Sequence, residues 1–280
     1  MRVYLSCDIE GISGLVSWAQ CGRPNSEHFD YRWARERFTQ DVNAAIVGAF
    51  EGGATYVLVK DSHGNSKNLL IDQLDSRAEL VSGHGGSIFG MMAGIDSTFD
   101  AACLIGYHAK AGAWNGVMDH TISGRVHRLW VNETEMGEIG ISALDAGLLG
   151  VPIVAVTSDA AGCSEAKGHI HNLITYEVKQ AMGRYMAHSI HPENTAPQIQ
   201  SAVKRGVQAA AGINPFTLEK PFRVKIEFNR TEEASMCERI PGVTRVDGYS
   251  LTFTSDEWNQ AHRAIWTMIA MAEAGYQSNS

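Results

Sequence analysis

Two carboxylates, Asp8 and Glu10, stand two positions apart after the first apolar run of the chain, residues 3–7. In an extended backbone, side chains at positions i and i+2 point to the same side, so these two carboxylates converge. Two like charges held together repel, and their pKa values are pushed apart unless a cation or a shared proton lies between them. A bound metal ion is the simplest remedy, so the pair predicts a metal site.

Two later apolar runs lead to histidines. Residues 55–59 lead to His63, and residues 101–105 lead to His108. Near-continuous apolar runs are typical of buried parallel strands, and ligands gather at the carboxyl ends of such strands. We therefore expect both imidazoles near the carboxylate pair. A third carboxylate, Glu138, opens an expected helix.

Three carboxylates and two imidazoles suit zinc and tolerate manganese or cobalt. The predicted metal ligands are Asp8, Glu10, His63, His108 and Glu138. A single catalytic zinc normally takes three protein ligands and water, so five ligands favour two metal ions per chain. Asp8, the more central of the first pair, is the expected bridge between them.

His120 is the candidate catalytic residue that is not itself a ligand. A neutral imidazole beside a metal centre can take or give a proton near pH 7. Structural alternatives exist: His120 could be a loop residue bonded to Asp119, Glu138 could serve only the helix dipole, and Asp61 could form a turn with its own backbone. Three separate apolar runs that end in metal-binding groups make the metal site the favoured interpretation.

Strands and helices alternate in the first part of the chain. Residues 32–51 have a helical apolar pattern that ends at two glycines, Gly52 and Gly53. The other expected elements are helices over residues 69–74 and 139–149 and strands over residues 79–81, 128–131 and 152–157. This alternation predicts an α/β fold with a mostly parallel central sheet flanked by helices.

From about residue 158 the sequence becomes richer in helix and then forms a smaller α+β C-terminal part. The expected elements are helices over residues 176–186, 198–211 and 256–274 and strands over residues 222–228 and 249–253. We expect a boundary near His191 and Pro192. It separates an α/β metal-binding catalytic domain, residues 1–191, from a smaller α+β domain, residues 192–280.

The composition limits the partners and the compartment. The 280-residue chain has a net charge of −8, which argues against nucleic acid and anionic membranes as partners. Its five cysteines include no C-x-x-C pair, as is typical of reduced thiols. The start of the chain runs directly into a strand with a carboxylate at Asp8, so we expect no signal peptide and a cytoplasmic location.

Several enzyme classes lack their signatures in this sequence. There is no G-x-S-x-G elbow, no P-loop and no H-E-x-x-H helix. Residues 11–14 have the glycine spacing of a dinucleotide loop. However, Asp8 and Glu10 would place negative charge where a pyrophosphate would bind. The sequence therefore argues against serine hydrolase, P-loop, zincin and dinucleotide-dependent chemistry.

Five motifs, in order, resemble those of the D-aminopeptidase family, peptidase family M55 of the DppA type. The motifs are CDIEGISG (residues 7–14), DSH (61–63), GYHA (106–109), GVMDH (116–120) and GEIG (137–140). They cover most of the first 160 residues, and a weaker resemblance continues to the final helix.

The resemblance implies a two-zinc aminopeptidase that releases N-terminal residues from short peptides, with D configuration in the known example. Carried over to this chain, the zinc ligands are Asp8, Glu10, His63, His108 and Glu138, and the catalytic residue is His120. It also implies a ring-shaped homo-oligomer, decameric in the known example, that encloses the active sites. Residues 17–31 and Asp119 depart from the family's pattern.

We therefore expect a metal-dependent aminopeptidase in which two zinc ions polarise the scissile carbonyl and activate water. In this hypothesis His120 transfers a proton or attacks directly. Two alternatives stay open. One is a dinuclear phosphoesterase, for which Lys60, Lys67 and Lys110 are candidate phosphate contacts. The other is a metal-binding assembly protein without catalysis.

Overall fold

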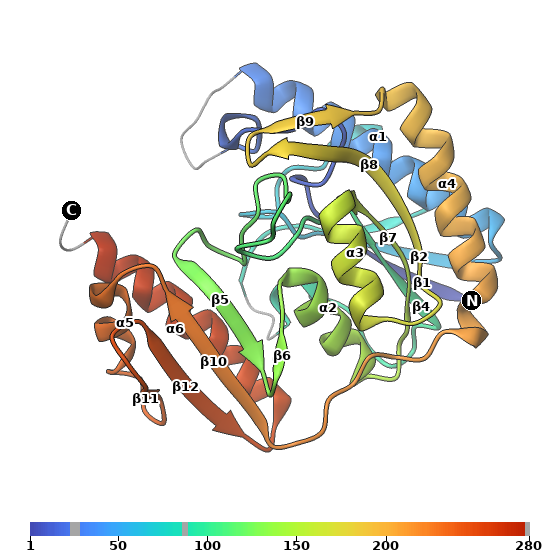
Figure 1. Cartoon of the computed structure of the whole chain (residues 1–280). Coiled ribbons are helices and arrows are strands. Elements are labelled where there is room, and N and C mark those ends of the chain that lie inside the picture. The colour runs from blue at the N-terminus through green and yellow to red at the C-terminus, as the bar shows by residue number, and fades with distance from the viewer. Residues whose placement is uncertain (23–28, 86–88, 278–280) are drawn as a thin grey trace. The chain divides into compact units, whose positions relative to one another are not determined.

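The computed structural model describes residues 1–22, 29–85 and 89–277 (Figure 1). The chain divides into two compact units, each with its own sheet. Unit 1 comprises Met1–Ala109, Ala113–Met118 and Ile139–Thr217. Unit 2 comprises Lys110–Gly112, Asp119–Glu138 and Leu218–Ser280.

Unit 1 is built on a seven-stranded sheet with the strand order β3-β2-β1-β4-β7-β8-β9. Neighbouring strands run parallel, except that β9 is antiparallel to β8. All residues of β4 and β7 are buried, as expected for parallel strands covered on both faces. The strands are β1 (Arg2–Cys7), β2 (Tyr56–Asp61), β3 (Glu79–Val81), β4 (Ala101–Ile105), β7 (Ile153–Asp159), β8 (Ile174–Gly183) and β9 (Met186–Ser189).

Four α-helices cover this sheet. Helices α1 and α4 pack side by side on one face, and α2 and α3 lie on the other (Figure 1). The backbones of α1 and α4 come close at Gly48, where a Cβ atom would lie 2.3 Å from the carbonyl oxygen of Gln200. The helices are α1 (Phe29–Glu51), α2 (Glu138–Gly147), α3 (Ala160–His169) and α4 (Pro192–Ala209), with 3₁₀ turns at Trp18–Gln20, Ile71–Gln73, Gly90–Met92 and Ala210–Gly212.

Unit 2 contains a five-stranded antiparallel sheet with the order β11-β12-β10-β5-β6. Helices α5 and α6 pack against each other, and α6 also packs on β10 and β12. Alternate residues of β10 are buried, and one of them, Phe222, contacts Trp258 of α6 edge to face. The elements are β5 (Val126–Val131), β6 (Thr134–Glu135), β10 (Phe222–Phe228), β11 (Thr244–Arg245), β12 (Ser250–Ser255), α5 (Thr231–Cys237) and α6 (Trp258–Gln277).

The predicted fold class is confirmed: a mostly parallel sheet flanked by helices, with a smaller α+β part. The strands expected over residues 79–81 and 222–228 have the expected bounds. The strand expected over residues 128–131 exists as part of β5, but it pairs antiparallel with β10 in unit 2.

The helix predicted over residues 176–186 is wrong. These residues belong to β8, the turn that follows it and the start of β9. The β-branched and aromatic residues Ile174, Thr175, Tyr176 and Val178 favour a strand, and pairing with β7 buries it. One charged residue of this strand, Lys179, is fully buried.

The two units group some residues differently from the expected boundary at His191 and Pro192. Helix α4 belongs to unit 1, and residues 119–138 belong to unit 2. All five cysteines are buried, and none of them forms a disulfide in the described part of the chain. None of the helices in the described part of the chain has the length and apolar character needed to cross a membrane. Of residues 17–31, which depart from the family's pattern, residues 23–28 lie outside the described part.

Candidate metal centre

The carboxyl ends of three neighbouring strands meet where the sequence predicts the site. Strand β1 is central, and its last residue, Cys7, is in register with Asp61 of β2 and Ile105 of β4. Just beyond, the amide of Asp8 donates to the Ile105 carbonyl at 2.8 Å, and the amide of Ser62 donates to the Cys7 carbonyl at 2.8 Å. The polar residues that follow these strands are therefore held at one edge of the sheet.

Two glycines allow the loops at this edge to approach closely. The amide of Gly11 donates to the Gly106 carbonyl at 2.7 Å. A Cβ atom at Gly106 would lie 2.2 Å from the carbonyl oxygen of Asp8, and one at Gly11 would lie 1.8 Å from that of Tyr107. Gly106 also has φ +69°, which favours glycine. These glycines bring the loop after β1 against the loop that carries His108.

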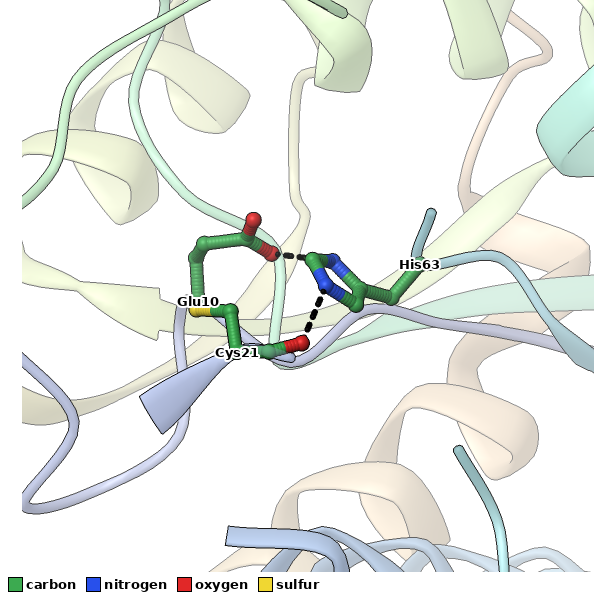
Figure 2. A group of neighbouring side chains, drawn as sticks. All are labelled: Glu10, Cys21 and His63. Carbon is green, nitrogen blue, oxygen red and sulfur yellow. Dashed lines mark hydrogen bonds and ion pairs between the residues drawn. The ribbon is translucent and has the colours of Figure 1, made fainter. Parts of the chain in front are cut away.

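The imidazole of His63 lies against both carboxylates of the opening pair. Its Nδ1 lies 3.2 Å from Asp8 Oδ1 and 2.9 Å from Glu10 Oε2. Its Nε2 lies 3.0 Å from the carbonyl oxygen of Cys21, which can only accept a hydrogen bond. Figure 2 shows His63 between Glu10 and Cys21, with one ring nitrogen facing each. The bond to Cys21 places a proton on Nε2 and turns Nδ1 toward the carboxylates.

His108 also has one ring nitrogen near a backbone carbonyl and the other near a carboxylate, but the two nitrogens exchange roles relative to His63. Its Nδ1 lies 3.0 Å from the carbonyl oxygen of Ala109, and its Nε2 lies 3.6 Å from Asp8 Oδ2. Histidines that bind metals usually donate their second ring N–H to a carbonyl or carboxylate, which fixes the ring and its tautomer. Both His63 and His108 have this second contact, so each has one nitrogen directed at the carboxylates.

Asp61 has a structural role, but it bonds the backbone seven and eight residues further on and does not form the turn considered from the sequence. Its carboxylate accepts hydrogen bonds from the amides of Asn68 and Leu69 at 2.6 and 2.8 Å. The side-chain amide of Asn68 donates to Asp61 and also to the carbonyl of His63, both at 2.8 Å. Asp61 thus closes the loop after β2 and fixes the backbone that presents His63.

Burial and mutual charge shift the pKa values of this group apart. Burial and the negative charge of Asp8 raise the pKa of Glu10. Burial also acts to raise the pKa of Asp8, but the hydrogen bond from His63 and the nearby His108 outweigh it and hold that pKa well below its usual range. Burial disfavours a charged His63, yet Glu10 and Asp8 outweigh this and raise its pKa. A positive charge is thus strongly favoured beside the carboxylate pair.

The donor set of unit 1 fits a divalent metal. Ligand atoms of Asp8, Glu10 and His108 all lie within 4.8 Å of one another, and all three residues are buried. Carboxylate oxygens and imidazole nitrogens are ligands of zinc, and buried carboxylates need a nearby cation. Of the six predicted site residues, unit 1 brings together four: Asp8, Glu10, His63 and His108.

The other two predicted residues form a pair in unit 2. His120 Nε2 lies 3.6 Å from Glu138 Oε1, and both side chains are buried. Glu138 Oε1 also accepts a hydrogen bond from the Ile122 amide at 2.6 Å. Asp119, the neighbour of His120, accepts a hydrogen bond from the Gly112 amide at 2.8 Å. The buried carboxylate beside His120 is therefore Glu138.

Cys21 is a residue that sequence reasoning did not place at the site. Ligand atoms of Glu10, Cys21 and His63 lie within 4.8 Å of one another (Figure 2). A thiolate is also a zinc ligand type. Cys21 directly follows the 3₁₀ turn at Trp18–Gln20. Its spacing in the sequence gives no sign that it lies near Glu10 and His63, because tertiary contacts bring it there.

Comparisons with known proteins agree with this donor set. The family whose description is D-aminopeptidase, peptidase family M55, matches residues 1–267. A D-aminopeptidase from Bacillus subtilis (strain 168) is 32% identical over 275 residues, which is 97% of this chain and 98% of that protein.

A solved structure is similar over nearly the whole chain. It is the zinc-dependent D-aminopeptidase DppA from Bacillus subtilis, described as a self-compartmentalizing protease. The TM-score is 0.89 at 31% identity, and the match covers 98% of each chain. This chain therefore belongs to the D-aminopeptidase family, the zinc-dependent metallo-aminopeptidases of peptidase family M55.

Proposed function

We propose that this chain uses two zinc ions to hydrolyse the bond after the N-terminal residue of short peptides, with preference for a D residue at that position. The observation that carries this proposal is the group of three buried side chains, Asp8, Glu10 and His108, with the partly buried His63, in a chain of the D-aminopeptidase family. Family membership favours this activity over the phosphoesterase and over the assembly protein without catalysis.

The proposed zinc ligands are Asp8, Glu10, His63, His108 and Glu138. Asp8 is the best candidate for the shared ligand, because Oδ1 lies near His63 and Oδ2 lies near His108. Its two oxygens thus face different imidazoles, so Asp8 could contribute to the binding of both ions. His63 would bind through Nδ1 and His108 through Nε2, because their other nitrogens contact backbone carbonyls.

Zinc supplies Lewis acidity at such a site and lowers the pKa of water toward about 7. The protein holds the reacting groups and moves the proton. His120 is the proposed catalytic residue, since a buried imidazole can accept a proton from water and pass it to the leaving amine. Glu138 Oε1 lies 3.6 Å from His120 Nε2, so a carboxylate that would hold zinc also lies beside the proposed catalytic imidazole.

A substrate panel tests the proposed function directly. The zinc-loaded protein would be assayed with D- and L-alanyl anilides, with D-alanyl and L-alanyl dipeptides, and with a phosphodiester. We expect zinc-dependent release of the N-terminal residue, faster for the D than for the L substrates, and no phosphodiester hydrolysis. Hydrolysis of the phosphodiester alone would favour the phosphoesterase, and no hydrolysis of any substrate would favour the protein without catalysis.

We also propose that the chain forms a ring-shaped homo-oligomer of ten copies in the cytoplasm. The support for the assembly is the self-compartmentalizing relative, and the support for the location is that the described cysteines form no disulfide. Mass photometry of the purified protein tests the assembly. A single species with the mass of one chain would contradict it.

A further inference from the structure

Lys179 is a fully buried lysine in the middle of β8. Its Nζ atom donates hydrogen bonds to three backbone carbonyls, those of Glu10, Ile12 and Leu15, at 2.5, 2.8 and 2.6 Å. An ammonium group has three protons, so this arrangement uses all of its donors. The ammonium group of lysine places three N–H donors on one nitrogen, so it can bond three carbonyls that surround it.

The three carbonyls belong to the segment that follows β1. This segment begins with Glu10, whose carboxylate contacts His63, and runs to Leu15. It is also held by β9 and the residue after it: the Gly14 amide donates to Ser189 Oγ at 3.2 Å, and Ser13 Oγ donates to the Ile190 carbonyl. One edge of the sheet therefore supports the backbone on which Glu10 stands.

We propose that Lys179 is a positioning residue that holds the backbone of Glu10 so that its carboxylate is aimed at the metal. The proposal rests on the proposed function, because it takes Glu10 to be a metal ligand. Lys179 acts on Glu10 through the carbonyl of that same residue, and through two more carbonyls that fix the direction of the chain after it. Lys179 itself touches neither metal nor substrate.

Removal of the ammonium would leave three buried carbonyls without their donor. Methionine at position 179 has nearly the same length but no proton to donate, so the segment would move to find other partners. Arginine keeps the positive charge, yet no single nitrogen of its planar guanidinium group can donate to all three carbonyls. We therefore expect Lys179→Met to lower zinc affinity more than Lys179→Arg does. Mutation of a residue that orients a metal ligand typically lowers metal affinity by about 10- to 100-fold.

A purely structural lysine would also lower stability when replaced, so the test needs a control that is matched in stability. Val203→Ala provides it, because Val203 is buried on α4 in unit 1 and makes none of these contacts. Zinc affinity would be measured by chelator competition for the wild type, Lys179→Met, Lys179→Arg, Val203→Ala, Glu10→Gln and the double variant Glu10→Gln/Lys179→Met. Unfolding by urea would be measured on the same samples.

We expect Lys179→Met to bind zinc about 10- to 100-fold more weakly, Lys179→Arg to be intermediate, and Val203→Ala to keep wild-type affinity at comparable loss of stability. In the Glu10→Gln background, Lys179→Met should add little further loss, because both changes act on one ligand. Should Lys179→Met fail to fold, the same comparison is made with Lys179→Arg in both backgrounds.

Two outcomes would overturn the proposal in distinguishable ways. If Glu10→Gln weakens zinc binding but the Lys179 variants bind as wild type or add their full effect to it, Lys179 does not act through Glu10 and the ligand set stands. If Glu10→Gln itself leaves zinc binding unchanged, Glu10 is not a ligand, and the proposed metal centre fails together with the role of Lys179.

Discussion

His63 Nδ1 lies 2.9 Å from Glu10 Oε2, although the two residues follow different strands of the sheet. This contact joins the carboxylate pair after β1 to the loop after β2. It also favours a positive charge beside the carboxylates: burial acts to lower the pKa of His63, but the negative charge of Glu10 and the hydrogen bonds with Asp8 and Glu10 outweigh burial and raise that pKa. A metal ion would take over the role of that positive charge.

The first prediction concerns metal content. Protein reconstituted with zinc should carry about two zinc ions per chain, because the five proposed ligands exceed the three protein ligands that one catalytic zinc takes. Elemental analysis of the dialysed protein measures this number. One ion per chain, or none, would contradict the dinuclear centre.

The second prediction separates the shared ligand from a ligand of one ion. Asp8→Asn should lose the second zinc and nearly all activity, because both oxygens of Asp8 face imidazoles. Glu10→Gln should retain more zinc, because its carboxylate is assigned to a single ion. Elemental analysis of the two variants, prepared side by side, gives the comparison. If Glu10→Gln lost more zinc than Asp8→Asn, the assignment of the bridge would be wrong.

The third prediction concerns His120. His120→Ala should keep its zinc and fold but lose turnover by about 100-fold or more, which is the usual scale for a general acid or base. His127→Ala is a suitable control, since His127 lies in the same unit with a half-exposed side chain. Its turnover should match the wild type. Loss of zinc in His120→Ala would show that His120 is a ligand instead.

The fourth prediction concerns Asp41, which is buried on α1. Burial raises the pKa of its carboxyl to about 7, against the opposing effects of Arg37 and Lys179. Between the ordinary pKa of about 4 and this value, the folded protein holds a proton that the unfolded chain has released, so stability falls as pH rises.

Asp41→Asn replaces the titrating carboxyl with an amide, so its contribution to the pH dependence of stability is lost. The variant should be more stable than the wild type at pH 8, by about 2–4 kcal/mol, and the two proteins should converge near pH 4. Urea unfolding at several pH values between 4 and 8 tests this. Parallel stability curves for the two proteins would show that Asp41 does not titrate in this range.

Local patterns could place several candidate site residues near one another, but they did not predict every surrounding element. Three apolar runs end in polar groups, and parallel strands bring their carboxyl ends to one edge, so Asp8, His63 and His108 could be placed near one another from local patterns. Strand β8 could not be recognised in this way. Lys179 is buried because three backbone carbonyls from residues 10–15 accept its hydrogen bonds. The spacing of residues around Lys179 does not reveal partners so far away in the sequence.

Pairing between segments that are distant in the sequence also could not be predicted from local patterns. Strand β5 was recognised as a strand, but its partner β10 begins at Phe222, far along the chain, so the sheet that it joins could not be read from its own residues. Cys21 likewise reaches Glu10 and His63 through a loop whose path depends on tertiary contacts. Local patterns predict elements and strand ends, whereas the choice of partners is a property of the whole chain.

The most direct test of the central claim is the rate of zinc-dependent hydrolysis of D-alanyl and L-alanyl p-nitroanilide by the same preparation. It would be measured after zinc reconstitution, after chelation, and after zinc is restored. We predict hydrolysis of the D substrate at a higher kcat/KM than the L substrate, loss of the activity on chelation, and its return with zinc. Equal activity with and without metal, or no hydrolysis of either anilide by fully zinc-loaded protein, would contradict a zinc-dependent aminopeptidase.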